Sequence, residues 1–503
     1  MSTIRKQSLI SSAIVYAGFA LGFFNTYLFT REGGFTKEQY GVTQTFLAVA
    51  AVLYSMASLG SSAYIGKFFP YYEAHLERRR NDQLSWALLL PVIGFGVVSI
   101  LGLLFKVPVA NRMFNNSPEL LRYYYWLFPF GFGFTLYLIL ESYAWMLGKS
   151  VLSNLFKELI FRLLFTLLIA LTYFGVIRNF DTFIHLFSFL YLVLALGLLI
   201  VFYRQGRLNF HLRASKVTRR LRQRILALSA YFWGSGILSN IAQQCDKLMI
   251  AAILPNGMAM AGIYSLGEIL SGLIQAPQRA VVSASVSALS HAWRDKDLER
   301  IKRIYHRSAL NQLIFAVCMF GIVWLNFKDA LHTFHIQKDF SASFTVFFFL
   351  GLTRIVDMGT GVSSQIILTS TRWRFEFNSG MLLLVASLGI NYLLTSRLGI
   401  LGPALSNLIA FTAYNTVRFV FLWRRYGMQP FSKESLYTLL LGAAACCAAY
   451  FPCKDHTGFG WLILRGMLFC AVFVPGVVLL KLSPDVAPIW ATVRKRIGFG
   501  NRQ

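Results

Sequence analysis

The sequence is dominated by long apolar stretches, which constrain the fold more than any other feature. A helix needs about 20 mostly apolar residues to cross the hydrocarbon core of a bilayer. We find fourteen stretches of this kind and predict an all-α polytopic membrane protein with about 14 transmembrane helices. The predicted spans lie near residues 9–29, 40–64, 84–105, 120–143, 153–175, 182–203, 226–252, 259–283, 306–327, 342–368, 376–396, 401–423, 433–451 and 459–480.

The composition agrees with this fold class. Hydrophobic residues make up 56% of the 503 residues and charged residues only 14%, whereas a soluble domain carries about 25% charged residues. The six cysteines lie in or beside apolar stretches without metal-ligand spacing, so we interpret them as packing residues and expect no metal. The N-terminus combines basic residues with an apolar run but lacks a cleavage site, which indicates a first spanning helix rather than a signal peptide.

The net charge of +27 raises the question of nucleic-acid binding, but the placement of the basic residues argues against it. With both termini in the cytoplasm, the predicted cytoplasmic segments hold more than three times as many Lys and Arg residues as the predicted outside loops. This is the bias that the positive-inside rule requires of an even number of spans. Much of the charge therefore sets the topology, and no nucleic-acid partner is expected.

A basic segment divides the chain. Residues 204–224 hold eight basic residues and no acidic one, which indicates either a surface helix on anionic lipid or a solvated loop. The weak similarity of residues 36–50 to 258–272, each opening the second span of a half, indicates parallel repeats. The predicted domains are an N-terminal six-helix bundle (1–203), a basic cytoplasmic linker (204–225), a C-terminal six-helix bundle (226–423), and a C-terminal helix pair with a basic tail (424–503).

The stretch 239–284 contains two apolar runs that each carry a polar stripe. A charge at the bilayer centre costs about 2.5–3.5 kcal/mol on insertion scales, so such stripes should face protein or water. Together they predict an internal aqueous cavity. In the second run, spacings of three and four place one face's polar residues at Tyr264, Glu268, Ser271, Gln275 and Gln278. In the first run, the corresponding face holds Asn240, Gln243, Gln244 and Lys247, with Asp246 to one side.

Cations predominate among the ionisable groups predicted inside spans. We predict that they line the cavity and bind an anionic group of the substrate, such as a phosphate or a carboxylate. The alternative is structural, because Arg162 has Glu158 at i−4, Arg354 has Asp357 at i+3, and cations near span ends can reach the interface. Glu141 has no local partner. The predicted substrate-binding cations are Arg162, Lys247, Arg279, Arg354 and Arg418.

Two sequence blocks carry a family resemblance. The block 245–270 has an Asp-basic-apolar run, a short turn and then Gly-x-Tyr, and the block 56–72 has Leu-Gly, small residues and a basic ending. With the fourteen spans, they resemble the multidrug/oligosaccharidyl-lipid/polysaccharide exporter superfamily, and within it the polysaccharide biosynthesis proteins of the Wzx-type oligosaccharide flippases. The resemblance implies a V-shaped pair of helical bundles around a cationic cavity, in a bacterial inner membrane.

The expected function is therefore the transport of polyprenyl-pyrophosphate-linked oligosaccharide for surface polysaccharide synthesis. A lipid II flippase and a multidrug or cation exporter of the same superfamily are the alternatives, although a cation exporter needs an acidic cavity. A membrane-embedded glycan polymerase or glycosyltransferase is the alternative from another class. Such enzymes place catalytic groups on sizeable outside loops, and here the longest run about fourteen residues, so no catalytic residue is predicted.

Transport of this kind requires an energy source and partners in the membrane. We predict that Asp246, Glu268 or Asp357 carries a coupling proton or sodium ion, and no cofactor is expected. The expected partners are the lipid-linked oligosaccharide, membrane lipids, and a polysaccharide polymerase or other assembly proteins. Rocking of one half against the other would alternate access to the cavity.

Overall fold

The structure is a computed structural model that describes residues 3–77, 80–108, 115–206, 213–454 and 456–483, and these residues are helical apart from turns and connections. Eleven helices in this part of the chain are long and apolar enough to cross a membrane. Three further predicted spans correspond to α1 (Thr3–Thr30), to the broken helix over residues 150–173, and to α19 (Leu401–Tyr426). The prediction of an all-α polytopic fold with about 14 spans is confirmed.

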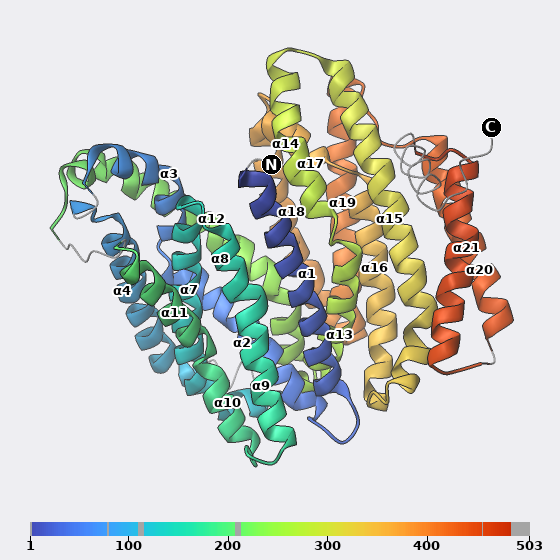
Figure 1. Ribbon diagram of the computed structural model, residues 1–503, viewed down its shortest axis with the longest axis horizontal. Helices are drawn as coiled ribbons and strands as arrows, with labels where there is room; N and C mark the ends of the chain where they lie inside the picture. The colour runs from blue at the N-terminus through green and yellow to red at the C-terminus, as the bar shows by residue number, and fades with distance from the viewer. Residues whose placement is uncertain (1–2, 78–79, 109–114, 207–212, 455, 484–503) are drawn as a thin grey trace. The chain divides into compact units, whose positions relative to one another are not determined.

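Contacts divide the chain into two compact units, Met1–Gly262 and Ile263–Gln503. In the first unit, α7 packs against α2, α4 and α11, and its core is rich in aromatic rings such as the stacked pair Phe130 and Phe187. After α1, the elements of this unit are α2 (Lys37–Ala57), α3 (Ser61–His75), α4 (Gln83–Leu104), α6 (Pro118–Arg122), η2 (Tyr124–Trp126), α7 (Leu127–Met146), α8 (Ser150–Asn154), η3 (Leu155–Ile160), α9 (Phe161–Tyr173), α10 (Phe180–Ser188), α11 (Leu190–Arg204) and α12 (Lys216–Ile253) (Figure 1).

The predicted second span, 40–64, is interrupted between α2 and α3. Leu59 and Gly60 there have φ angles of 46° and 74°. A Cβ atom on Gly60 would lie 2.3 Å from the carbonyl oxygen of Ser229 on α12, so only glycine permits this approach. The indole Nε1 of Trp233 on α12 also donates to the carbonyl oxygen of Met56 at 2.9 Å. The break therefore brings α12 against α2 and α3.

The basic segment continues directly into α12, which has 38 residues and a length of about 57 Å. A helix of this length exceeds the hydrocarbon core by about 27 Å, so its basic first turns extend beyond the apolar layer. Its N-terminus is fixed by Asp82, whose Oδ2 accepts from the Ser215 backbone N–H at 2.9 Å and from the Thr218 hydroxyl at 2.7 Å. From Lys216 onward the segment is thus neither a separate surface helix nor a loop.

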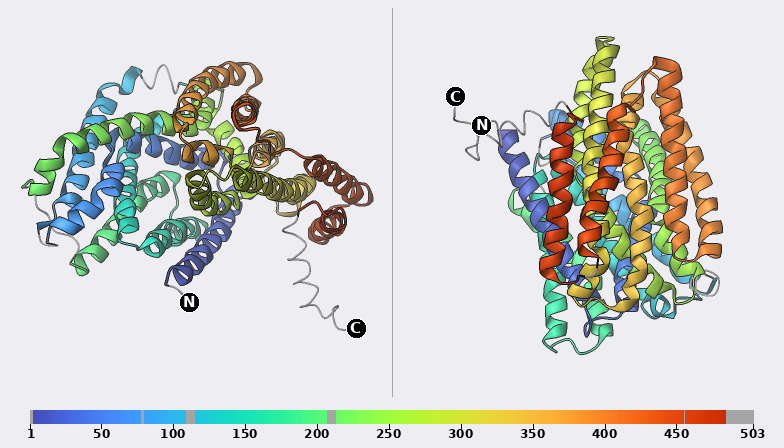
Figure 2. Two further views of the ribbon diagram at one scale, coloured as in Figure 1. Left: turned by 90° about the horizontal axis from the view of Figure 1, so that it is seen from above. Right: turned by 90° about the vertical axis from the view of Figure 1, so that its right-hand side faces the viewer.

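The second unit contains two helical hairpins, α18 with α19 and α20 with α21, whose members run side by side (Figures 1 and 2). The long helix α15 packs against α16, α20 and α21. The elements of the second unit are most of α13 (Gly257–Ile274), α14 (Gln278–Arg294), α15 (Leu298–Thr333), η4 (Lys338–Ala342), α16 (Ser343–Gly359), α17 (Ser363–Thr369), α18 (Trp373–Leu398), α19, α20 (Lys433–Cys453) and α21 (Phe459–Leu479).

Two more predicted spans are interrupted in this unit. The span 259–283 breaks at Pro277, where α13 ends and α14 begins, as expected for a residue that lacks a backbone N–H. The span 342–368 breaks at Gly361, with a φ of 59°, where a Cβ atom would lie 2.7 Å from the backbone nitrogen of Ala309 on α15. The second break lies one turn after Asp357 and helps to position the site described next.

Candidate functional site

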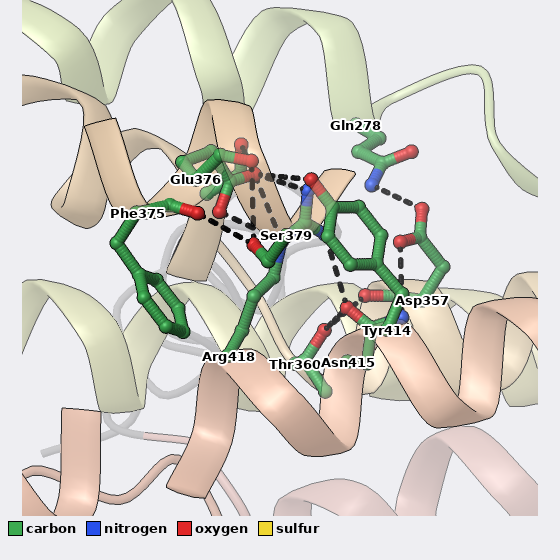
Figure 3. Close-up of polar contacts among 10 residues, drawn as sticks. Gln278, Asp357, Thr360, Phe375, Glu376, Ser379, Tyr414, Asn415 and Arg418 are labelled. Atoms are coloured by element: carbon green, nitrogen blue, oxygen red, sulfur yellow. Dashed lines mark hydrogen bonds and ion pairs between the residues drawn. The ribbon is translucent and has the colours of Figure 1, made fainter. Parts of the chain in front are cut away.

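A buried ion pair between Glu376 and Arg418 joins α18 to α19 (Figure 3). Glu376 lies in the first turn of α18 and is 5% exposed, and Arg418 lies about two turns before the end of α19 and is 9% exposed. The Arg418 Nε donates to both carboxylate oxygens, at 2.9 and 3.2 Å, and Nη2 donates to Oε1. The guanidinium carbon also lies 3.6 Å from the ring centroid of Tyr414. This charge is therefore compensated within the unit.

Neutral donors complete the coordination of the Glu376 carboxylate. The hydroxyls of Ser364 on α17 and Tyr414 on α19 donate to Oε1 at 2.7 and 2.9 Å. A buried carboxylate is stable only when its lone pairs are satisfied in this way. The carboxylate consequently ties three helices together.

Asp357 on α16 belongs to the same network through Asn415 (Figure 3). Its Oδ1 accepts from the Asn415 Nδ2 at 3.4 Å, and its Oδ2 accepts from the Gln278 Nε2 at 2.9 Å. The Asn415 Oδ1 accepts from the Thr360 hydroxyl at 2.9 Å and from the Arg418 Nη1 at 3.3 Å. A single amide thus connects the half-buried Asp357 to the buried ion pair.

Arg354 has a different environment from Arg418. It lies in the C-terminal half of α16, its side chain is half-buried, and its Nε is buried without a hydrogen-bond partner. Within the described residues Arg354 forms no ion pair, so the i,i+3 contact with Asp357 that the sequence allowed is not made. An uncompensated cation in a membrane span is costly, and it favours contact with water or an anionic ligand.

A second cluster of charges lies in the first unit, around η3. This π-helical turn carries Lys157, whose Nζ lies 3.2 Å from Oε2 of Glu141, a residue only 3% exposed on α7. The Arg162 Nη2 lies 2.8 Å from the Glu158 Oε2, which confirms the expected i,i+4 pair. π-Helical turns inside helices are frequent at functional sites.

Two glycines of α1 make room for this cluster. A Cβ atom on Gly18 would lie 2.6 Å from the Glu158 carbonyl oxygen, and one on Gly22 would lie 2.7 Å from the Arg162 Nη1. Their spacing of four residues places both on one face of α1, as in small-residue contacts between membrane helices. The Arg162 guanidinium carbon also lies 5.4 Å from the ring centroid of Phe19.

The remaining predicted site residues are distributed over both units. Asp246 and Lys247 lie on α12 in the first unit and Glu268 lies on α13 in the second, all three half-buried. Arg279 is in the first turn of α14, and its side chain lies outside the described residues. The structure therefore links Asp357 to Arg418 through Asn415 and joins Arg162 to Glu158.

Sequence reasoning missed several members of these clusters. Glu376 is the first residue of a predicted span, and the sequence indicates neither its pairing with Arg418 nor the pairing of Lys157 with Glu141. The acids themselves partly indicate these pairs, because Glu376 at the start of a span and Glu141 inside one both require a partner when they are buried. The partners themselves lie 42 and 16 residues away in sequence, beyond any helical spacing.

No protein-family model matches this sequence, and no curated protein sequence matches it either. Solved structures do match. The lipid II flippase MurJ in an inward closed conformation superposes with a TM-score of 0.74 at 14% identity, over 94% of this chain and 98% of the flippase. An inward-facing multidrug resistance MATE family transporter of the MOP superfamily gives 0.63 at 14% identity, over 83% of this chain and 97% of that one.

A third match is a MOP superfamily transporter from Pyrococcus furiosus whose binding pocket is described as reversed in polarity. Its TM-score is 0.54 at 13% identity, and the match covers 84% of this chain and 95% of that one. At such identities the similarity concerns the fold alone. The chain is a multi-pass membrane protein with the fold of these flippases and transporters.

Proposed function

We propose that this protein flips polyprenyl-pyrophosphate-linked oligosaccharide across the bacterial inner membrane for the synthesis of O-antigen, capsule or exopolysaccharide. The observation that carries the proposal is Arg354, a half-buried cation on a spanning helix with no ion pair among the described residues. A pyrophosphate would supply the missing negative charge through charge-assisted hydrogen bonds. The comparison with a flippase over 94% of the chain agrees with a lipid substrate.

The other predicted cations have separate roles in this proposal. Lys247, Arg162 and Arg279 contact the pyrophosphate or the sugar during its passage, and the Arg162–Glu158 pair leaves about a fifth of each side chain exposed for this purpose. Arg418 acts through Glu376 and Asn415 to hold α18 and α19 beside the Arg354 helix. Its charge is compensated, so it positions the site rather than adding to its attraction for anions.

We assign ion coupling to three half-buried acids. Asp357 is half-buried and its hydrogen-bond partners are two neutral amides, so it is our first choice for the residue that binds the coupling ion. Glu268 and Asp246 are half-buried on α13 and α12 and are the further candidates. Uptake at Asp357 would change its contact with Asn415 and thereby reach the Arg418 network.

Two transport alternatives follow from specific observations. A lipid II flippase is supported by the similarity to MurJ. An exporter of organic cations is supported by the MATE comparisons and by Asp357, which forms no ion pair within the described residues. The Asp357 carboxylate accepts two amide hydrogen bonds, whereas the Arg354 Nε has no partner, and this difference favours an anionic substrate.

The proposal is tested in proteoliposomes that contain a fluorescent polyprenyl-pyrophosphate-linked oligosaccharide, with translocation measured by loss of access to an impermeant glycosidase. Removing one charge-assisted hydrogen bond costs about 1.5–3 kcal/mol, so Arg354→Ala should slow translocation by about 10- to 100-fold. Arg354→Lys should retain more activity because it keeps the charge.

The matched control is Arg397→Ala, which removes an exposed arginine from the last turn of α18. This variant should translocate at the wild-type rate. Wild-type translocation by a folded Arg354→Ala protein would contradict the proposal. Translocation of lipid II in place of the glycan would favour the lipid II flippase, and uptake of ethidium would favour the exporter of organic cations.

The remaining parts of the proposal concern the cell. We place the protein in the inner membrane with both termini in the cytoplasm, and we propose that it works beside a polysaccharide polymerase or other assembly proteins. The bias of basic residues toward one set of loops supports this orientation. Cysteine labelling at Lys454, on a loop predicted to be outside, with a membrane-impermeant reagent tests it.

A further inference from the structure

A cationic cavity of about 530 Å³ lies in the second unit, at the end of α15 that carries Thr333 and at the turn between α20 and α21. It is large enough for a lipid headgroup, because ligand pockets commonly measure 300–1,000 Å³. The cavity lies where three predicted spans end, and therefore near the membrane–water interface. Its lining residues include Trp324, Lys328, His332, Tyr450, Lys454 and Arg465.

The charge of this cavity is strongly biased. Lys328, His332 and Lys454 are exposed on its wall, and none of them pairs with a carboxylate in the part of the chain that the structure describes. Among the described lining residues the acid is Asp329, which is 7% exposed and already paired. It accepts from the Gly458 backbone N–H at 3.2 Å and lies 3.5 Å from the Arg465 Nη1.

Arg465 holds the cavity in shape. It is 5% exposed, and its Nη2 donates to the carbonyl oxygens of Cys453 and His456 at 2.9 and 3.1 Å, on either side of Lys454. Its Nη1 donates to the Leu325 carbonyl oxygen on α15 at 3.2 Å. One buried side chain thus fixes the turn that carries Lys454 relative to the helix that carries Lys328.

The cavity also offers apolar surface and a buried donor. Phe344 stacks against Trp324 with a centroid distance of 6.3 Å, and the Lys328 Nζ lies 4.7 Å from the Phe344 centroid. The Trp324 indole Nε1 is buried and has no acceptor among the residues that the structure describes. A buried donor without a partner is costly, so an acceptor atom of a bound ligand would stabilise this indole N–H.

We propose that this cavity binds the phosphate of a membrane lipid. The two lysines bind the phosphate oxygens, the Trp324 N–H donates to an oxygen of the headgroup or the ester, and the aromatic wall covers the first part of an acyl chain. The site is separate from Arg354 and does not depend on the proposed transport function. A free phosphate or pyrophosphate shares the same chemistry, so the test must distinguish it from a lipid.

The test uses the full-length protein in a neutral detergent and measures binding of three probes by native mass spectrometry. The probes are phosphatidylglycerol, phosphatidylcholine and sodium pyrophosphate. At about 1 kcal/mol for each basic residue, Lys328→Gln with Lys454→Gln should weaken phosphatidylglycerol binding about 30-fold. The matched control is Lys338→Gln with Arg397→Gln, which removes two exposed cations that do not line the cavity and should leave binding unchanged.

A second variant tests whether the lysine substitutions weaken binding only through the long-range effect of the lost charges. Trp324→Phe keeps the aromatic wall and removes the N–H, so it should weaken binding without changing the net charge. Phosphatidylglycerol binding that both variants weaken, with a preference over phosphatidylcholine that the lysine variant reduces, supports the lipid site. Pyrophosphate binding that is lost in the same variants, without a preference for phosphatidylglycerol, assigns the phosphate contacts to a soluble ligand and overturns the lipid assignment. Equal phosphatidylglycerol binding by wild type, the lysine variant and the control overturns the proposal.

Discussion

Removing one member of the Glu376–Arg418 pair should destabilise the second unit strongly, and removing the second member as well should add no further loss. In Arg418→Gln the carboxylate remains buried with only the hydroxyls of Ser364 and Tyr414 as donors. In Glu376→Gln the guanidinium keeps the Asn415 Oδ1 and the Tyr414 ring. Each single variant therefore leaves one full charge in a site that is less than one-tenth exposed.

The magnitude follows from the cost of an uncompensated buried charge. Removing one partner of a buried ion pair costs about 3–5 kcal/mol, and the retained hydrogen bonds place both single variants near 3 kcal/mol. The double variant buries two neutral amides in the same space, and replacing both ions is often close to neutral, so we expect a loss of about 1–3 kcal/mol. The coupling energy between the two positions is then about 3–5 kcal/mol.

The assay is reversible unfolding in mixed micelles by titration with sodium dodecyl sulfate, followed by tryptophan fluorescence for the four proteins of the cycle. The free energy of unfolding of each variant gives the coupling energy directly. Arg424→Gln, on the same helix but exposed near its end, serves as the control and should stay within about 0.5 kcal/mol of wild type. A coupling energy below about 0.5 kcal/mol would refute the claim that the pair holds α18 and α19 together.

Three further predictions concern coupling, packing and pH. Glu268→Gln should reduce the dependence of translocation on a proton or sodium gradient, and proteoliposomes with imposed gradients test this; unchanged dependence places the coupling elsewhere. Gly18→Ala should lower the free energy of unfolding by about 1–3 kcal/mol because its Cβ meets the backbone of η3, whereas Gly66→Ala, with no atom near its Cβ, should not; equal stabilities would contradict the close packing. Burial raises the pKa of Tyr72, whose hydroxyl also forms a hydrogen bond with Thr218 beside Asp82. The stability that the protonated Tyr72 contributes is therefore complete below the ordinary tyrosine pKa of about 10 and falls as the pH rises further. In thermal unfolding between pH 8 and 11, the melting temperature of Tyr72→Phe should decline less steeply than that of the wild type.

The helices could be predicted from the sequence because hydrophobic length is a local property. Their interruptions could not, because hydropathy continues across Gly60, Pro277 and Gly361. At Gly60 and Gly361 the reason for the break lies in another helix, whose backbone approaches within 3 Å of where a Cβ would be. Only Pro277 carried a visible signal of its own. Sequence therefore located the spans but not the points at which they bend.

The same distinction between local and non-local contacts decides the candidate site. The Arg162–Glu158 pair was predictable because its members are one turn apart on one helix. The pair of Arg354 with Asp357 was equally allowed by spacing, yet Asp357 is bonded instead by Gln278 and Asn415, which lie 79 and 58 residues away. Spacing states which contacts a helix permits, and neighbouring helices determine which of them form.

This difference changes how the charge of a membrane site should be counted. The sequence predicts a substrate-binding role for both Arg354 and Arg418. In the structure Arg418 pairs with Glu376, whereas Arg354 has no carboxylate partner among the described residues. A neutralised pair contributes rigidity and little attraction for an anion, whereas an uncompensated guanidinium contributes attraction at a cost in stability. Arg354→Ala should therefore impair translocation without loss of stability, and Arg418→Gln should impair translocation through loss of stability. The same protein preparations measured in both assays separate the two roles.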